Sequence, residues 1–171
     1  MMADGLTYKM PLEVYLQAAV VRGVLETNQS RLSSHLILRE GDEVFFLHAA
    51  SLERLDRSVI AAGSDEFLIY MQEIFLIADL SPQSEHTVSA HLFVKKESSR
   101  ALLSVGPYWL QGNIHILPGG ALDELLLAKT RFVPVTEATL LDRPDRGVRT
   151  YLVNRTKIGF ITALNESLVE L

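Results

Sequence analysis

Five histidines are the residues of this chain best suited to acid–base catalysis or metal binding, because imidazole titrates near neutral pH and binds transition metals. They are His35, His48, His86, His91 and His115. No two of them have the spacing of a His-x-x-x-His metal motif, and the chain contains no cysteine that could complete a metal site. We therefore expect single surface or core histidines, with no metal and no cofactor, and keep a site assembled in three dimensions as the alternative.

Serine and carboxylate chemistry finds little support in the sequence. Ser33 and Ser34 stand beside His35, but the glycine-flanked serine turn of hydrolases is missing around them. Asp123 and Glu124 could suggest paired carboxylates, yet neighbouring side chains on the predicted helix point in different directions. The sequence therefore favours a protein without catalytic activity.

The main candidates for ligand binding are three arginines in the segment 142–149. They are Arg143, Arg146 and Arg149. Arginine can hold a carboxylate or a phosphate through paired N–H bonds. Asp142 and Asp145 neutralise much of this positive charge, so we favour a solvated loop and keep an anion site as the alternative. Pro118-Gly119-Gly120 lacks the Lys-Ser/Thr pair of a phosphate-binding P-loop and is interpreted as a strand-to-helix turn.

Composition excludes several classes of function. With 171 residues, of which 48% are hydrophobic and 22% charged, the chain has the composition of an ordinary globular protein. A net charge of -5 repels phosphate backbones, which disfavours nucleic acid as a partner. The apolar stretches at 67–80 and 101–117 are interrupted by polar residues, and residues 1–10 lack the apolar run of a signal peptide. We expect no membrane span and a cytoplasmic location, which the absence of cysteine also permits.

The residues above must be positioned by a chain that is mostly extended. Alternating residues predict a strand at 13–25, and the apolar run 44–52 predicts another that is buried on at least one side. Gly23 is expected to mark a bulge or a close approach of two backbones. Ser30 is expected to cap a short helix over 31–38.

The second half of the chain carries a similar series of elements. Strands are predicted over 88–94, 101–117 and 132–140. A polar turn is expected at 95–100 and a break in the strand at Gly106-Pro107. The clearest helix spans 121–129, and Pro134 indicates an edge or a bulge in the strand that follows.

The strongest pattern in the chain is an internal duplication. The stretch 67–80 aligns with 151–164 without a gap, and the apolar residues match in register. Shorter matches upstream join 31–36 with 121–126 and 50–52 with 138–140. Both long stretches are predicted to be tight hairpins, with turns at 71–73 and 154–157. Each half of such a repeat must offer a face that the other half or a partner covers.

These elements predict a mainly β (α+β) fold. We expect a tandem repeat of two small antiparallel β units, either sheets or barrels, each with one short helix and packed together. The predicted boundaries are 1–80 for the first repeat, 81–87 for a polar linker and 88–171 for the second repeat.

The segment 111–120, with the helix and strand that follow it, resembles a group of uncharacterised bacterial two-repeat proteins. In that group a strand with glycine and a Pro-Gly turn precede a Leu-Asp-x-Leu helix and a Phe-x-Pro-x-Thr-x-Ala strand. The matching residues here are 118–119, 122–125 and 132–138. The resemblance implies a bacterial protein with no known activity, and it supplies no catalytic residue.

Together these patterns favour a cytoplasmic, non-catalytic binding or protein-interaction module whose ligand is unknown. The alternative is a small-ligand sensor or enzyme with a cleft between the two repeats, which a polar cleft holding His48, His91 or His115 beside carboxylates would favour. The aromatic pairs Phe45-Phe46 and Tyr108-Trp109 could form a ligand surface, although such residues more often lie in a core or a subunit interface. An exposed apolar sheet edge would indicate a homo-oligomer.

Overall fold

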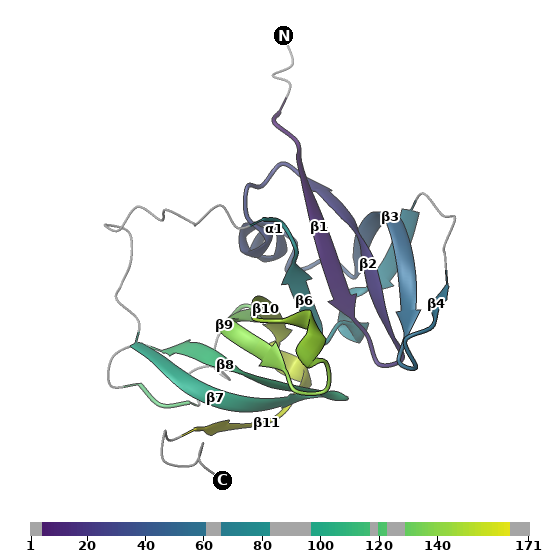
Figure 1. Cartoon of the computed structure of the whole chain (residues 1–171). Coiled ribbons are helices and arrows are strands. Elements are labelled where there is room, and N and C mark those ends of the chain that lie inside the picture. Colours follow the sequence, from purple (N-terminus) through teal and green to yellow (C-terminus); the bar gives the residue numbers. More distant parts are fainter. Residues whose placement is uncertain (1–4, 61–65, 83–96, 117–119, 123–128, 165–171) are drawn as a thin grey trace. The chain divides into compact units, whose positions relative to one another are not determined.

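The structure is a computed structural model that describes residues 5–60, 66–82, 97–116, 120–122 and 129–164. It is mainly β, as predicted, and its strands pair antiparallel (Figure 1). The chain divides into two compact units, Met1–Ser81 (unit 1) and Pro82–Leu171 (unit 2). No helix within the described ranges is long and apolar enough to cross a membrane.

Unit 1 is built around a hairpin of two long strands that continues into a third. Its strands are β1 (Tyr8–Tyr15), β2 (Ala19–Thr27), β3 (Val44–Arg54), β4 (Val59–Ile60), β5 (Glu66–Tyr70) and β6 (Leu76–Asp79). Their order is β6-β1-β2-β3, and both β4 and β5 pair with β3. Helix α1 (Leu32–Leu38) connects β2 to β3, and a turn of 3-10 helix, η1 (Met71–Glu73), connects β5 to β6.

Unit 2 contains a five-membered strand order, β11-β7-β8-β9-β10. Its strands are β7 (Glu97–Val105), β8 (Tyr108–Ile116), β9 (Phe132–Leu140), β10 (Arg149–Asn154) and β11 (Ile158–Ala163). Two 3-10 turns, η3 (Pro144–Arg146) and η4 (Arg155–Lys157), flank β10. A barrel requires the first and last strands of the order to pair, and the described strands do not close in this way, so the barrels that we considered are wrong.

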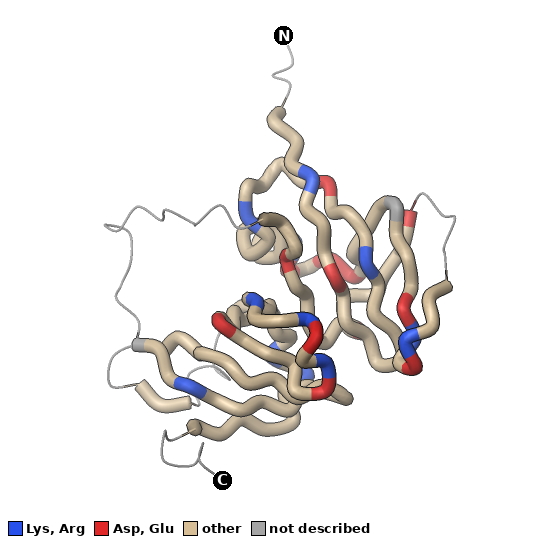
Figure 2. The backbone as a smooth tube through the Cα atoms, viewed as in Figure 1, with Lys and Arg blue, Asp and Glu red and all other residues tan. Residues whose placement is uncertain are grey.

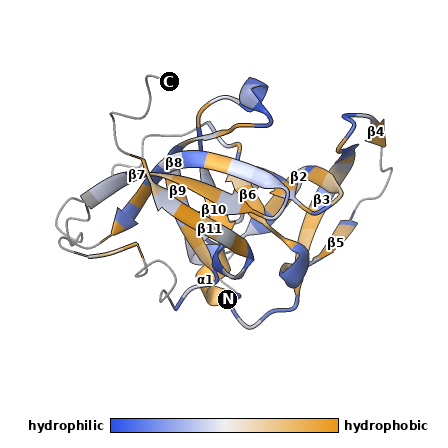
Figure 3. Cartoon of the chain, turned by 90° about the horizontal axis from the view of Figure 1, so that it is seen from below, coloured by the Kyte–Doolittle hydropathy of each residue, from blue (hydrophilic) through white to orange (hydrophobic). Residues whose placement is uncertain are grey.

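The core of each unit comes mainly from apolar side chains of the strands, and in β6 and β10 successive residues are buried. Charged residues are spread over strands and turns (Figure 2), whereas apolar residues run along the strands (Figure 3). Fully buried side chains in unit 1 include Leu12, Val14, Leu47, Ile74, Leu76 and Ile77, and those in unit 2 include Leu103, Leu110, Ile114, Val135, Tyr151 and Val153. Each buried aliphatic side chain contributes about 1.5–3 kcal/mol, so these positions hold the strands in place.

Two glycines allow a close approach of neighbouring strands. The register between β2 and β3 shifts at Gly23, which confirms the predicted bulge, and the register between β8 and β9 shifts at Gly112. A Cβ atom on Gly23 would lie 3.0 Å from the His48 carbonyl oxygen, and one on Gly112 would lie 2.6 Å from the Ala138 Cβ. Both positions therefore exclude a larger side chain.

The predicted single strand over 13–25 is wrong. These residues form the end of β1, a tight turn and most of β2, and the Leu16 N–H donates to the Ala19 carbonyl over 2.8 Å to close the turn. The turn lacks Gly, Pro, Asn and Asp, and the apolar alternation continues through it. The sequence therefore gave no signal that the chain reverses.

The two predicted hairpins at 67–80 and 151–164 are also wrong. The strand before each turn and the strand after it pair with different partners: β5 pairs with β3 and β6 with β1, while β10 pairs with β9 and β11 with β7. A 3-10 turn replaces the hairpin turn in both places. Met71 in the first of these turns is buried, which anchors the turn in the core.

The first predicted helix is confirmed as α1, but its predicted cap is wrong. Arg31 occupies the N-cap position, and no side chain caps the helix. The Thr27 hydroxyl instead accepts a hydrogen bond from the Gln29 N–H at 3.0 Å, which stabilises the turn ahead of the helix. The predicted break at Gly106-Pro107 is confirmed as the turn between β7 and β8.

Other expectations in the second half have mixed outcomes. The polar turn at 95–100 is wrong from Glu97 onward, because β7 begins there and pairs with β8. The pairing of β9 with β8 ends at Val135, one residue before Pro134 is reached. Pro134 therefore lies at a local edge of the sheet, as predicted, where no hydrogen bond to β8 needs its N–H. The strand at 88–94, most of the linker 81–87 and most of the helix 121–129 lie outside the described residues.

Candidate functional site

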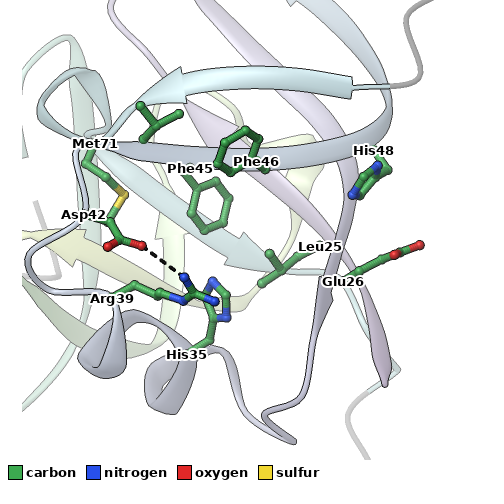
Figure 4. A pocket seen from close by; sticks show the side chains of 10 residues that line it. Leu25, Glu26, His35, Arg39, Asp42, Phe45, Phe46, His48 and Met71 are labelled. Atoms are coloured by element: carbon green, nitrogen blue, oxygen red, sulfur yellow. Dashed lines mark hydrogen bonds and ion pairs between the residues drawn. The ribbon is translucent and has the colours of Figure 1, made fainter. Parts of the chain in front are cut away.

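A small pocket opens in unit 1 where β2 and β3 separate (Figure 4). The pairing between these strands ends at Val24 and His48. His48 also pairs with Glu66, so β5 lies along the opposite edge of β3 and does not replace β2. The resulting pocket, here called the His35 pocket, has a volume of about 130 Å³. Its polar lining is Glu26, His35, Arg39, Asp42 and His48, and its apolar lining includes Leu25, Phe45, Phe46 and Met71.

His35 is held at this pocket by contacts from two strands. Its Nδ1 lies 2.8 Å from the Thr27 Oγ1 of β2, and its ring meets the Phe45 ring of β3 edge-on at 6.1 Å. Arg39 reaches toward the imidazole in Figure 4, and its Nη1 lies 3.4 Å from the Asp42 Oδ2. Burial lowers the pKa of His35 below 6.5, the Arg39 guanidinium lowers it further, and Asp42 acts in the opposite direction.

The lowered pKa of His35 predicts that unit 1 loses stability in acid. The unfolded chain takes up a proton near the ordinary value of 6.5, whereas the folded protein does so only at lower pH. The free energy of unfolding should therefore fall as the pH drops below about 6.5, and His35→Gln should flatten this part of the profile. Urea unfolding, followed by far-UV circular dichroism at about pH 8 and about pH 5, measures the difference. Equal pH dependence in the variant and the wild type would contradict the prediction.

The structure brings two of the five histidines to one pocket. His48 lies in the His35 pocket with the carboxylates of Glu26 and Asp42, whereas His115 belongs to unit 2, where its Nε2 lies 2.7 Å from the Thr136 Oγ1. The remaining two histidines, His86 and His91, lie outside the described residues. Within the part of the chain that the structure describes, no group of three or more His, Asp or Glu side chains is placed to hold a metal ion.

The suggested nucleophile and base do not come together. The His35 imidazole contacts the Thr27 hydroxyl, while the neighbouring Ser33 is exposed on α1. Asp123 and Glu124 lie outside the described residues. The geometry around His35 therefore supplies a polar pocket without an assembled nucleophile.

The three candidate arginines lie around the turn η3 and the start of β10. Arg143 is buried, with 5% of its surface exposed, whereas Arg146 and Arg149 are partly exposed. The Arg146 N–H donates to the Arg143 carbonyl over 3.0 Å, so the segment forms a closed turn. Because Arg143 is buried, the three guanidinium groups do not form one exposed patch. An anion site at these arginines stays a prediction.

An exposed apolar surface lies on the outer strands of unit 1. Phe46, Leu68 and Tyr70 are 45%, 57% and 58% exposed, and Phe46 of β3 stands directly opposite Leu68 of β5. We call these three side chains the β3–β5 face. Phe45 is buried, because successive side chains of a strand point to opposite faces of the sheet. The sequence drew attention to the Phe45-Phe46 pair without showing which ring is exposed.

The second aromatic pair behaves in the same way. Tyr108 is buried, whereas Trp109 is 41% exposed. The Trp109 ring contacts the exposed Phe160 ring edge-on at 5.3 Å, across the small side chain of Ser104 on the strand between them. Both predicted aromatic pairs thus contribute one residue to a core and one to a surface.

No protein family model, curated protein or solved structure matches the chain. The resemblance to bacterial two-repeat proteins therefore stays a prediction.

Proposed function

We propose that the chain is a non-catalytic protein-interaction module of the cytoplasm that binds its partner at the β3–β5 face and the adjoining edge of β5. The observation that carries this proposal is an open strand edge bordered by exposed apolar side chains. Within the described part of the chain, β5 pairs with β3 alone, so its second edge faces away from the sheet.

The backbone alternation of β5 determines which groups this edge offers. In an antiparallel pair, residues that exchange hydrogen bonds with the partner alternate with residues that point their N–H and C=O away from it. The Met71 N–H donates to the Glu43 carbonyl over 2.8 Å, and the continuous register from there places Phe67 and Ile69 in hydrogen-bonding positions toward β3. The backbone groups of Leu68 and Tyr70 consequently point to the open edge.

This edge lacks most of the features that protect exposed strands. Natural proteins guard such edges with charges, proline or bulges. Glu66 is the one charged residue of β5, the strand contains no proline, and its register with β3 is continuous. An extended segment can add to an edge of this kind, with main-chain hydrogen bonds giving affinity and side-chain contacts giving specificity.

Affinity purification with a matched pair of variants tests this function. Leu68→Lys adds a charge at the centre of the edge, and Leu55→Lys makes the same change at an exposed leucine in a turn of unit 1. Proteins that co-purify with the wild type and with Leu55→Lys should be lost from Leu68→Lys. Retention of every specific partner by Leu68→Lys, or turnover of a substrate at a described residue, would overturn the proposal.

We also propose that the two units are copies of one ancestral module. The strand order β6-β1-β2-β3-β5 in unit 1 corresponds to β11-β7-β8-β9-β10 in unit 2. In each unit a glycine marks a register shift between the third and fourth strands of this order. The Leu80 N–H donates to the Pro11 carbonyl over 2.8 Å, and the Leu164 N–H donates to the Arg100 carbonyl over 2.9 Å. These matching bonds support the tandem repeat that the sequence predicted.

A small-ligand sensor is the second candidate, and the His35 pocket is the observation that favours it. Ligand pockets usually have volumes of roughly 300–1,000 Å³. The His35 pocket is smaller, at about 130 Å³, so it suits a small ion or a single side chain. Titration with acetate or phosphate should shift the His35 ring signals in NMR spectra, and Arg39→Gln should abolish the shift if the pocket binds anions.

A further inference from the structure

We propose that the partner at the β5 edge is a second copy of this chain. The two β5 strands would pair antiparallel around a twofold axis midway between the two copies of Leu68, which face each other; this is called the axis through Leu68. This inference rests on the proposed function of the edge and identifies its occupant. The sheet of unit 1 would then continue into the sheet of the second copy. Such an interface is self-complementary, as a twofold dimer requires.

The backbone of β5 allows this pairing. Leu68 lies at the middle of the strand and points its N–H and C=O toward the open edge. Two Leu68 residues facing each other across a twofold axis exchange both of their hydrogen bonds, as in any hydrogen-bonded antiparallel pair. Tyr70 of each copy then stands opposite Glu66 of the other, which completes a register along the whole strand.

The side chains select this register over its neighbours. An axis through Glu66 would place two carboxylates directly opposite each other, which destabilises a strand pair. An axis through Tyr70 would bring η1, which is helical, into the position of the pairing strand. The axis through Leu68 avoids both problems, because Glu66 then faces a tyrosine and the full length of β5 is used.

The exposed apolar side chains explain what the dimer gains. Phe46 stands opposite Leu68 across the β3–β5 pair, so the twofold axis creates a continuous apolar row of Phe46 and Leu68 from one copy and Leu68 and Phe46 from the other. Phe46, Leu68 and Tyr70 are each about half exposed in the single chain. Their burial adds a hydrophobic contribution to the main-chain hydrogen bonds.

Analytical ultracentrifugation of the full chain over a concentration series tests the dimer. The wild type and Leu55→Lys should show a concentration-dependent dimer, and Leu68→Lys should raise the dissociation constant by roughly 100-fold or more, because two ammonium groups would meet at the axis. Leu68→Pro provides a second variant, since it removes an N–H that points to the edge and leaves the hydrogen bonds to β3 in place. A dimer that survives both substitutions would overturn the proposal.

Charge substitutions at Tyr70 test the register itself. Tyr70→Lys and Tyr70→Glu remove the same exposed ring, but only lysine would attract Glu66 of the second copy. The dissociation constant should be on the order of tenfold lower for Tyr70→Lys than for Tyr70→Glu, because each dimer contains two such cross-strand pairs. Equal constants would exclude this register.

The outcomes separate this inference from the proposed function. A monomeric wild type whose co-purifying partner is lost in Leu68→Lys would show that a different protein occupies the edge, so the dimer would be wrong and the function retained. A monomeric wild type with no partner that depends on Leu68 would overturn both.

The chain has no cysteine, so a spin label on Leu68→Cys reports directly whether two copies of this position are adjacent.

Discussion

Replacing Gly112 with alanine is expected to destabilise unit 2 by about 2–3 kcal/mol, because the new methyl group has no space. Its Cβ would lie 2.6 Å from the Ala138 Cβ and 2.9 Å from the Ala138 Cα, so the backbone of β9 would have to move. Trp109, the one tryptophan of the chain, lies on the same strand as Gly112. Its fluorescence during urea unfolding therefore reports the stability of unit 2 directly.

Three comparison variants make this result interpretable. Gly41→Ala has nothing within 4 Å of the new Cβ, so it should leave stability within about 1 kcal/mol of the wild type. Adding Ala138→Gly to Gly112→Ala should recover part of the loss, because it removes the nearest of the three atoms that the new Cβ would meet within 3.0 Å. Gly23→Ala should destabilise unit 1 by a smaller amount, since its nearest contacts are 3.0 Å or longer. A wild-type unfolding midpoint for Gly112→Ala would contradict the steric argument.

The sequence predicted local features of the fold well where a single residue type carries the physical reason. Gly23 indicated a close approach because a strand interior gains nothing else from glycine, and Pro134 indicated a local edge because proline has no N–H to donate. The strand at 132–140 was visible because branched and aromatic residues dominate it, and the strand at 44–52 because most of its residues are apolar.

The sequence could not reveal which strands pair with one another. The stretches 67–80 and 151–164 each contain two short extended runs around a polar turn, and local patterns of this kind resemble a hairpin. In the structure the second run of each stretch pairs with the first described strand of its unit, β1 or β7, so the paired residues are far apart in the chain. Apolar periodicity records that a strand is buried and does not record its partner.

The candidate surfaces could not be predicted from the sequence either, because they also depend on which strands pair with one another. Alternation implies that one of Phe45 and Phe46 is exposed, but the exposed one is fixed only when the covered face of β3 is known. The His35 pocket lies where the pairing of β2 with β3 ends at His48, while β5 pairs along the opposite edge of β3. No spacing of residues in the chain indicates where that pairing ends. The open edge of β5 was likewise hidden by the incorrect hairpin.

Replacing Asn154 with alanine is expected to destabilise unit 2 by about 1–3 kcal/mol, because it removes a buried acceptor that two groups use. Asn154 has no exposed surface, and its Oδ1 accepts hydrogen bonds from the Thr156 N–H at 3.1 Å and from the Thr156 hydroxyl at 2.7 Å. These bonds hold η4, the turn that directs the chain from β10 to β11.

Thr156→Ala provides the matched control for this effect. It removes the hydroxyl donor but keeps the N–H that Asn154 caps, so it should cost less than Asn154→Ala when both are measured by Trp109 fluorescence in urea. A larger loss in Thr156→Ala would show that the hydroxyl, and not the capped N–H, carries the stability of the turn. The alignment of 67–80 with 151–164 places Tyr70 at the position of Asn154, and Tyr70 makes no side-chain cap to η1 and is exposed on the β3–β5 face. At the same place in the strand order, one unit therefore carries a residue that stabilises the turn, and the other carries one that is available for the proposed dimer contact.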